Sequence, residues 1–129
     1  MDASTIILYV SRAAALLIAI PFHESAHALT AEMLGDKTGR NSGRISMNPA
    51  RHFDLFGFLC LMFTGVGWAK PTPVNPSNFK NEKAGMALTA LAGPVSNVVL
   101  SFLACVLLRV ASMTWLLYSG SMESWLYYL

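Results

Sequence analysis

Residues 23–27 form the sequence His23-Glu24-Ser25-Ala26-His27, which places two imidazoles and a carboxylate within five positions. On a helix, residues four apart share a face with Cβ atoms about 6 Å apart, so both imidazoles can reach one tetrahedral Zn²⁺. Glu24 can then lean over a water bound to that metal. The pattern is typical of zinc hydrolases. We predict that His23 and His27 are metal ligands, that Glu24 is the catalytic base and that each chain binds one Zn²⁺.

The alternative is that these side chains form only a polar cluster at a membrane interface, with Glu24 as the partner of His23 and His27. Three ionisable groups beside an apolar run are costly to keep there without a function. We therefore favour metal binding.

The motif lies near the end of a long apolar run that must position it. Residues 5–34 are predicted to form one continuous helix, long enough to cross a bilayer of about 30 Å, with Gly35 and Asp36 as its stop. Pro21, two residues before His23, removes a backbone hydrogen bond, so we expect a kink or a local loosening there.

The composition is that of a membrane protein. The 129 residues are 54% hydrophobic and 12% charged, against about 25% charged residues in soluble proteins. Seven of the nine Lys and Arg residues lie in segment 37–83, which the positive-inside rule assigns to the cytoplasmic face. They form no basic helix face, so we expect no nucleic-acid partner. We predict an all-α, multi-pass protein of the cell membrane, with residues 1–129 as one membrane-embedded domain and the bilayer as a partner.

The remaining segments are predicted from their glycines and prolines. Residues 43–49 have the pattern of a short strand that ends in a turn. Three glycines in residues 53–69 indicate a broken, re-entrant or partly extended segment, and three prolines in residues 68–76 favour an extended path. Such an edge can bind a substrate as an added strand. Residues 81–113 are predicted to be helical again, with a break at residues 90–97.

Four motifs occur in a fixed order along the chain: His23-Glu24-x-x-His27, Gly43-Arg44-Ile45-Ser46-x-Asn48-Pro49-x-x-His52, Gly67-Trp68-Ala69-Lys70-Pro71-x-Pro73-Val74-Asn75 and Ala92-Gly93-Pro94-x-x-Asn97. Together they resemble the site-2 protease family of intramembrane zinc metalloproteases, and most of all its small bacterial members without an inserted PDZ domain. The resemblance covers roughly residues 5–110. It implies a site-2 protease-like transmembrane core with short extended or β segments near 43–49 and 68–76.

The resemblance also implies roles for single residues. His23 and His27 match the zinc ligands of the family, and Glu24 matches its catalytic base. Gly93, Pro94 and Asn97 match a motif that can orient the substrate or the metal site. For Asn97, packing between membrane helices is an equal alternative.

The chain departs from the family at the third zinc ligand, an aspartate in a Leu-Asp-Gly segment downstream of the Gly-Pro-x-x-Asn motif. No aspartate follows Asp54 in this sequence. Because a catalytic zinc usually takes three protein ligands, two imidazoles alone would bind it weakly. We expect that the chain is incomplete at its C-terminus. His52 and Asp54 are the candidate substitute ligands, although His52 can be a structural loop residue and Asp54 can cap the following segment.

Two functions from different classes follow. The first is an intramembrane zinc metalloendopeptidase that hydrolyses peptide bonds in or near the transmembrane helices of membrane-protein substrates. The second is a catalytically inactive membrane binding or scaffold homologue that lacks the third ligand. Assembly into a homo-oligomer is left open in both. A zinc transporter would need more acidic or histidine residues along a path than the sequence contains.

Overall fold

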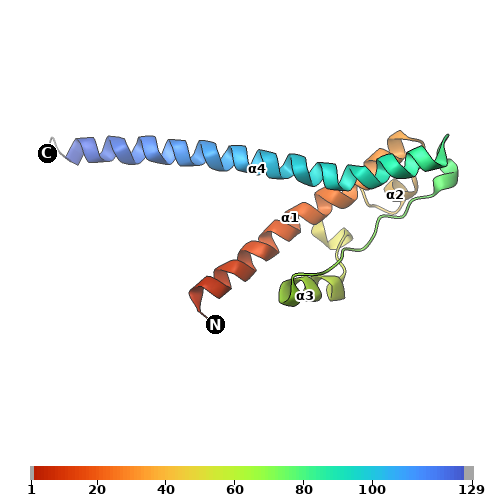
Figure 1. Cartoon of the computed structure of the whole chain (residues 1–129), viewed down its shortest axis with the longest axis horizontal. Coiled ribbons are helices and arrows are strands. Elements are labelled where there is room, and N and C mark those ends of the chain that lie inside the picture. Colours follow the sequence, from red (N-terminus) through yellow and green to blue (C-terminus); the bar gives the residue numbers. More distant parts are fainter. Residues whose placement is uncertain (1, 127–129) are drawn as a thin grey trace. The chain divides into compact units, whose positions relative to one another are not determined.

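The computed structural model describes residues 2–126, and all of its regular elements are helices (Figure 1). In chain order they are α1 (Ala3–Met33), α2 (Thr38–Asn41), the 3-10 helix η1 (Pro49–Arg51), α3 (Leu55–Thr64), the 3-10 helix η2 (Pro76–Asn78) and α4 (Glu82–Leu126). Within residues 2–126 there is no strand, so the expected all-α architecture is confirmed and the strand at residues 43–49 is wrong.

The contacts divide the chain into two units, Met1–Asn97 and Val98–Leu129, and the boundary falls inside α4. Each unit is described by itself. The first contains every candidate site residue named from the sequence. In the second, α4 continues with apolar side chains that are exposed, such as Leu107 and Trp115. The expectation of a single domain over residues 1–129 stays a prediction.

Helix α1 has the bounds expected from the sequence to within two residues. It begins after Asp2, whose side chain accepts a hydrogen bond from the Thr5 N–H. It ends at Met33, with Leu34 as its C-cap, and Gly35 follows with a left-handed φ of 111°. Pro21 is fully buried, and the helix continues through it. Pro21 has no N–H to donate to the carbonyl four residues earlier, so this turn is held by one hydrogen bond fewer.

Within the described part of the chain, two helices are long and apolar enough to cross a membrane, namely α1 and residues Glu82–Ser119 of α4. This fits an all-α membrane protein. Helix α3 is apolar but has ten residues and so spans about 15 Å, half of the hydrocarbon core. The expected break at residues 90–97 is wrong, because α4 continues through Pro94. A proline removes one hydrogen bond from a long helix but does not have to end it.

The three glycines near α3 have separate roles, so residues 53–69 are only partly irregular. Gly65 ends α3 with a left-handed φ of 78°. A Cβ on Gly57 would lie well under 3.0 Å from the carbonyl oxygen of Trp68, and one on Gly67 would lie well under 3.0 Å from the Gly57 carbonyl oxygen and from Leu61. The missing side chains therefore let the backbone of residues 66–69 lie directly on α3.

Residues 66–75 contain neither helix nor strand and are held by polar contacts at several points. The Lys70 N–H donates to the carbonyl of His52 at 3.0 Å. The buried guanidinium of Arg44 donates to the carbonyls of Arg51 and Lys70 at 3.0 and 3.1 Å. This buried cation is thus paired with two backbone dipoles, and it links the loop after α2 to the segment after α3.

Asp36 forms the second anchor of this segment and is fully buried. Its carboxylate accepts hydrogen bonds from the Thr38 N–H and hydroxyl, the Asn75 N–H and the Asn78 side chain. Burial raises the pKa of Asp36, but these hydrogen bonds outweigh it and lower the pKa from 3.8 to about 2. A lowering of this size corresponds to about 2 kcal/mol of stability.

We expect Asp36→Asn to lower the free energy of unfolding by about 2 kcal/mol at pH 7, because the amide cannot accept the same hydrogen bonds. The folded-state pKa is depressed, so the advantage of the unsubstituted chain is present above pH 4 and is lost as the pH falls toward 2. Unfolding in detergent micelles at pH 7, 4 and 3 measures both effects.

Asp54→Asn is the matched control for this measurement. Asp54 caps α3 by accepting from the Gly57 N–H at 2.8 Å, and asparagine caps helices about as well as aspartate. We expect a change within about 0.5 kcal/mol. Equal losses in the two variants would contradict the anchoring role of Asp36.

Candidate metal centre

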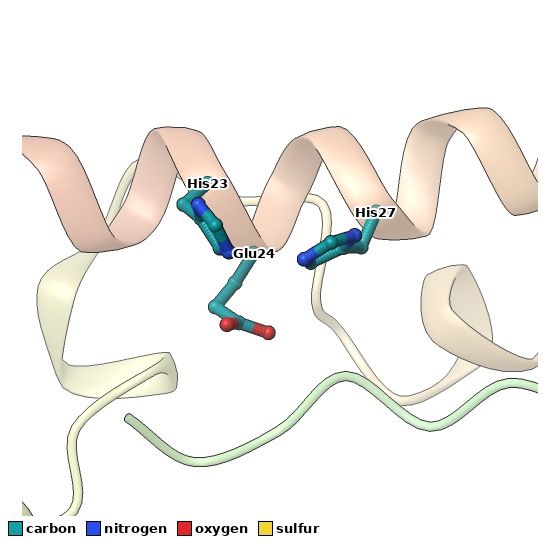
Figure 2. A group of neighbouring side chains, drawn as sticks. All are labelled: His23, Glu24 and His27. Carbon is teal, nitrogen blue, oxygen red and sulfur yellow. The ribbon is translucent and has the colours of Figure 1, made fainter. Parts of the chain in front are cut away.

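The side chains of His23, Glu24 and His27 lie close together on one side of α1. One ligand atom from each can be chosen so that all three lie within 4.8 Å of one another. The two imidazole rings have centroids 4.7 Å apart and planes nearly perpendicular, at 84°. Figure 2 shows both rings and the carboxylate leaving the same helix and converging. The spacing expected from the sequence is therefore present in the folded chain.

Gly93 of α4 lies directly against the two imidazoles. A Cβ built on Gly93 would come well under 3.0 Å from the Nε2 atoms of both His23 and His27. Any side chain at this position would thus occupy the space that both Nε2 atoms face. Glycine has no side chain to occupy that space. The two imidazoles can therefore direct their Nε2 atoms to one ion there.

The other ring nitrogen of each histidine is held by α4. His27 Nδ1 lies 2.6 Å from the carbonyl oxygen of Thr89. A carbonyl can only accept, so Nδ1 carries the proton and Nε2 keeps its lone pair for a metal. Nδ1–H to a backbone carbonyl is the partner that metal-binding histidines commonly have.

His23 Nδ1 lies 3.1 Å from the side-chain amide nitrogen of Asn97, while Asn97 Oδ1 is buried without a hydrogen-bond partner. A half-turn of this amide would place Oδ1 against His23 Nδ1–H. That orientation gives the oxygen its donor and leaves His23 Nε2 free for a metal. Asn97 can therefore set the tautomer of His23.

These donors fit zinc in type but supply only part of a catalytic site. Two imidazoles that can each offer Nε2 are ordinary zinc ligands. Among residues 2–119, whose side chains are described, no further His, Cys, Asp or Glu joins His23, Glu24 and His27. With Glu24 reserved as a base, the described part of the chain offers two ligands of the usual three.

Glu24 is buried and held by Thr72 of the segment after α3. The Thr72 N–H donates to Glu24 Oε2 at 3.0 Å, and the Thr72 hydroxyl lies 2.7 Å from the same oxygen and 3.1 Å from the Glu24 carbonyl. Both donors bind one carboxylate oxygen, so the side chain is fixed while Oε1 remains available. Thr72 is a site residue that the sequence did not single out, although it lies in the proline-rich segment predicted to pass the site.

The structure does not bring His52 or Asp54 to this cluster. His52 is fully buried, and its Nε2 lies 2.8 Å from the Ser46 carbonyl. Asp54 caps α3. Pro94, next to Gly93, is exposed. Thr89 was also missed from the sequence. It precedes Gly93 by four residues on α4, so the helical period could have placed it on the same face.

Comparison with known proteins gives one match of note. Over 93 residues the chain is 42% identical to "Putative zinc metalloprotease YwhC" of Bacillus subtilis (strain 168). The match covers 72% of this chain but 42% of that protein, so the chain spans less than half the length of this relative. No family model and no solved structure matches the chain.

We expect metal analysis of the detergent-purified chain to show that bound zinc is lost in His23→Ala and in His27→Ala, because each variant removes one of two imidazole ligands. His52→Gln is the matched control, since it removes the third histidine but keeps an amide that can donate to Ser46. Equal zinc in all three variants and in the parent would exclude this centre.

Gly93→Ala is expected to weaken zinc binding by about tenfold or more, because its methyl group displaces both Nε2 atoms. Gly85→Ala, two turns earlier on α4, presses on the ring of Phe79 instead and is expected to keep zinc affinity. Titration with a competing chelator measures both variants. A similar loss of affinity in Gly85→Ala would show that the effect of Gly93→Ala is not local.

Proposed function

We propose that the chain is a zinc metalloprotease of the site-2 protease type, which hydrolyses peptide bonds in or near the transmembrane helices of other membrane proteins. The observation that carries the proposal is the cluster of His23, Glu24 and His27 on a helix of membrane-spanning length. The name of the Bacillus subtilis relative supports the metalloprotease activity. The motifs shared with site-2 proteases support its action within the membrane.

His23 and His27 would hold the zinc through Nε2, with their Nδ1 atoms held by Asn97 and Thr89, respectively. When bound, Zn²⁺ lowers the pKa of water toward about 7 and polarises a carbonyl. Glu24 Oε1 takes the proton of the attacking water and later passes it to the leaving amine. Thr72 keeps the Glu24 carboxylate in one orientation for both transfers.

In this proposal the centre lies within the membrane, near its cytoplasmic side. Helix α1 has 31 residues and is therefore about 46 Å long, with the zinc motif in its C-terminal half. The basic segment 37–83 follows α1 and faces the cytoplasm by the positive-inside rule. Water then needs only a short polar path to reach Glu24.

The substrate is a membrane helix whose backbone is locally unwound, because helical carbonyls are already hydrogen-bonded. Addition of the substrate as a strand along residues 68–76 has little support. The N–H groups of Lys70, Thr72 and Asn75 donate within the chain, and Pro71 and Pro73 have none. Most of the hydrogen-bonding groups that this segment can offer a substrate backbone are therefore carbonyls.

The alternative is an inactive binding or scaffold protein of the same architecture. It is favoured by the two imidazole ligands that the described residues supply, where a catalytic zinc usually takes three protein ligands. The two proposals differ in whether Glu24 has a chemical role, and this can be tested directly.

We expect Glu24→Gln to abolish cleavage of a model transmembrane substrate while the zinc content stays unchanged, because the amide cannot accept the proton. The assay is gel analysis of a single-pass substrate incubated with the purified chain in proteoliposomes. Residual cleavage by Glu24→Gln would exclude Glu24 as the base. Absence of cleavage by the zinc-loaded parent chain would favour the scaffold.

Thr72→Val is expected to lower kcat by about tenfold to a hundredfold with little change in KM, since it frees the Glu24 carboxylate without removing it. Thr72→Ser keeps the hydroxyl and should restore most of the rate. The measurement is steady-state cleavage with zinc content as a check on folding. A rate for Thr72→Ser as low as that of Thr72→Val would contradict the role of the hydroxyl.

A further inference from the structure

A cavity of about 310 Å³ opens directly beside the candidate metal centre, within the first unit of the chain. His23, Glu24 and Asn97 form its polar end. A cavity of this volume lies at the lower limit of the usual range for small-ligand sites, about 300 to 1,000 Å³. Its volume and position suit one side chain of a peptide whose backbone lies at Glu24.

Most of the cavity wall is apolar. Leu16, Ala19 and Ile20 line it from one face of α1, as their spacing of three and four residues requires. Leu61 of α3 and Trp68 complete the wall. A ligand that fits both parts has an apolar group joined to a polar backbone, which is the chemistry of an aliphatic or aromatic amino-acid residue within a peptide.

The side of the cavity opposite α1 is built by close backbone packing. The carbonyl of Trp68 lies on Gly57, and Gly67 lies on Leu61, in both cases closer than any side chain would permit. The backbone of Trp68 is thereby held beside α3, although the residue is 54% exposed. The cavity therefore has a fixed wall on this side.

We propose that this cavity is the subsite for an apolar side chain next to the scissile bond, so that the substrates are membrane segments cleaved beside a residue such as leucine or phenylalanine. This inference rests on the proposed proteolytic function. A lipid or detergent tail fits the apolar wall equally well. It would place hydrocarbon against Glu24 Oε1 and His23 Nε2, and hydrocarbon offers these polar atoms no hydrogen bond.

The test changes the size of the cavity from two sides. Ala19→Phe fills it from α1, and Leu61→Ala enlarges it from α3. Ala14→Phe is the matched control, because it makes the same change on the same helix at an exposed position outside the cavity. Leu61→Ala keeps the test decisive if Ala19→Phe does not fold.

Binding is measured without turnover in the zinc-loaded Glu24→Gln chain. With Trp115 and Trp125 replaced by Phe, Trp68 remains as the single tryptophan, and its fluorescence reports occupancy of the cavity. The probes are acetylated and amidated pentapeptides that differ only at the central residue, which is glycine, alanine, leucine or phenylalanine.

We expect the leucine peptide to bind about tenfold or more tightly than the glycine peptide in this chain and in Ala14→Phe. Ala19→Phe is expected to remove the preference, and Leu61→Ala is expected to shift it from leucine toward phenylalanine. Equal binding of all four peptides, or equal preferences in Ala19→Phe and Ala14→Phe, would overturn the subsite and leave lipid or detergent as the occupant.

Cleavage of the same peptides by the zinc-loaded chain with Glu24 intact separates this inference from the proposed function. Preferential binding without cleavage would uphold the subsite and count against the protease. Cleavage at equal rates for all four peptides would uphold the protease and overturn the subsite.

Discussion

Glu24 and Ser25, in the C-terminal half of α1, are buried, and each has hydrogen-bond partners outside the helix. Glu24 is bound by Thr72, and Ser25 lies 3.1 and 2.9 Å from the carbonyls of Arg44 and Ser46. Because an unpaired buried polar group costs about 1 to 3 kcal/mol, these contacts constrain where the loops can lie. The arrangement of residues 43–75 follows from this requirement.

The same requirement applies to the two histidines on α1. Their partners, Thr89 and Asn97, come from α4, so the helix that completes the centre is positioned by the groups that set the tautomers. The loops thus supply the hydrogen-bond partners of Glu24 and Ser25, and α4 supplies those of the two histidines. Folding of the first unit and construction of the centre depend on the same hydrogen bonds.

The sequence predicted best the features that depend on local chemistry. The bounds of α1, the stop at Gly35 and the spacing of His23 and His27 follow from helical periodicity and glycine conformation. The ion pair between Glu32 and Arg40 likewise joins residues that are near each other in the sequence. Asp54 was considered both as a zinc ligand and as a helix cap. It caps α3, and this role also depends on residues next to it in the sequence.

The features that were missed depend on contacts between distant segments. Residues 43–49 were expected to form a strand, but the carbonyls of Arg44 and Ser46 accept hydrogen bonds from Ser25, and residues 2–126 contain no strand for them to pair with. Gly57 was read as a helix breaker, whereas it sits inside α3 because the carbonyl of Trp68 lies against it. The role of Thr72 could not be predicted, since nothing local requires a threonine to meet Glu24 48 residues away.

The contact of Gly93 with both imidazoles also fixes the register of α4 on α1. If α4 slid along α1 by about one turn, the side chain of Thr89 or Asn97, four residues from Gly93 on the same face, would enter the space that the two Nε2 atoms face. Movement of α4 along α1 and binding of an ion by the two Nε2 atoms therefore exclude each other. A bound ion would act as a pin against axial motion of these helices, and a force that moved one helix along the other would release it.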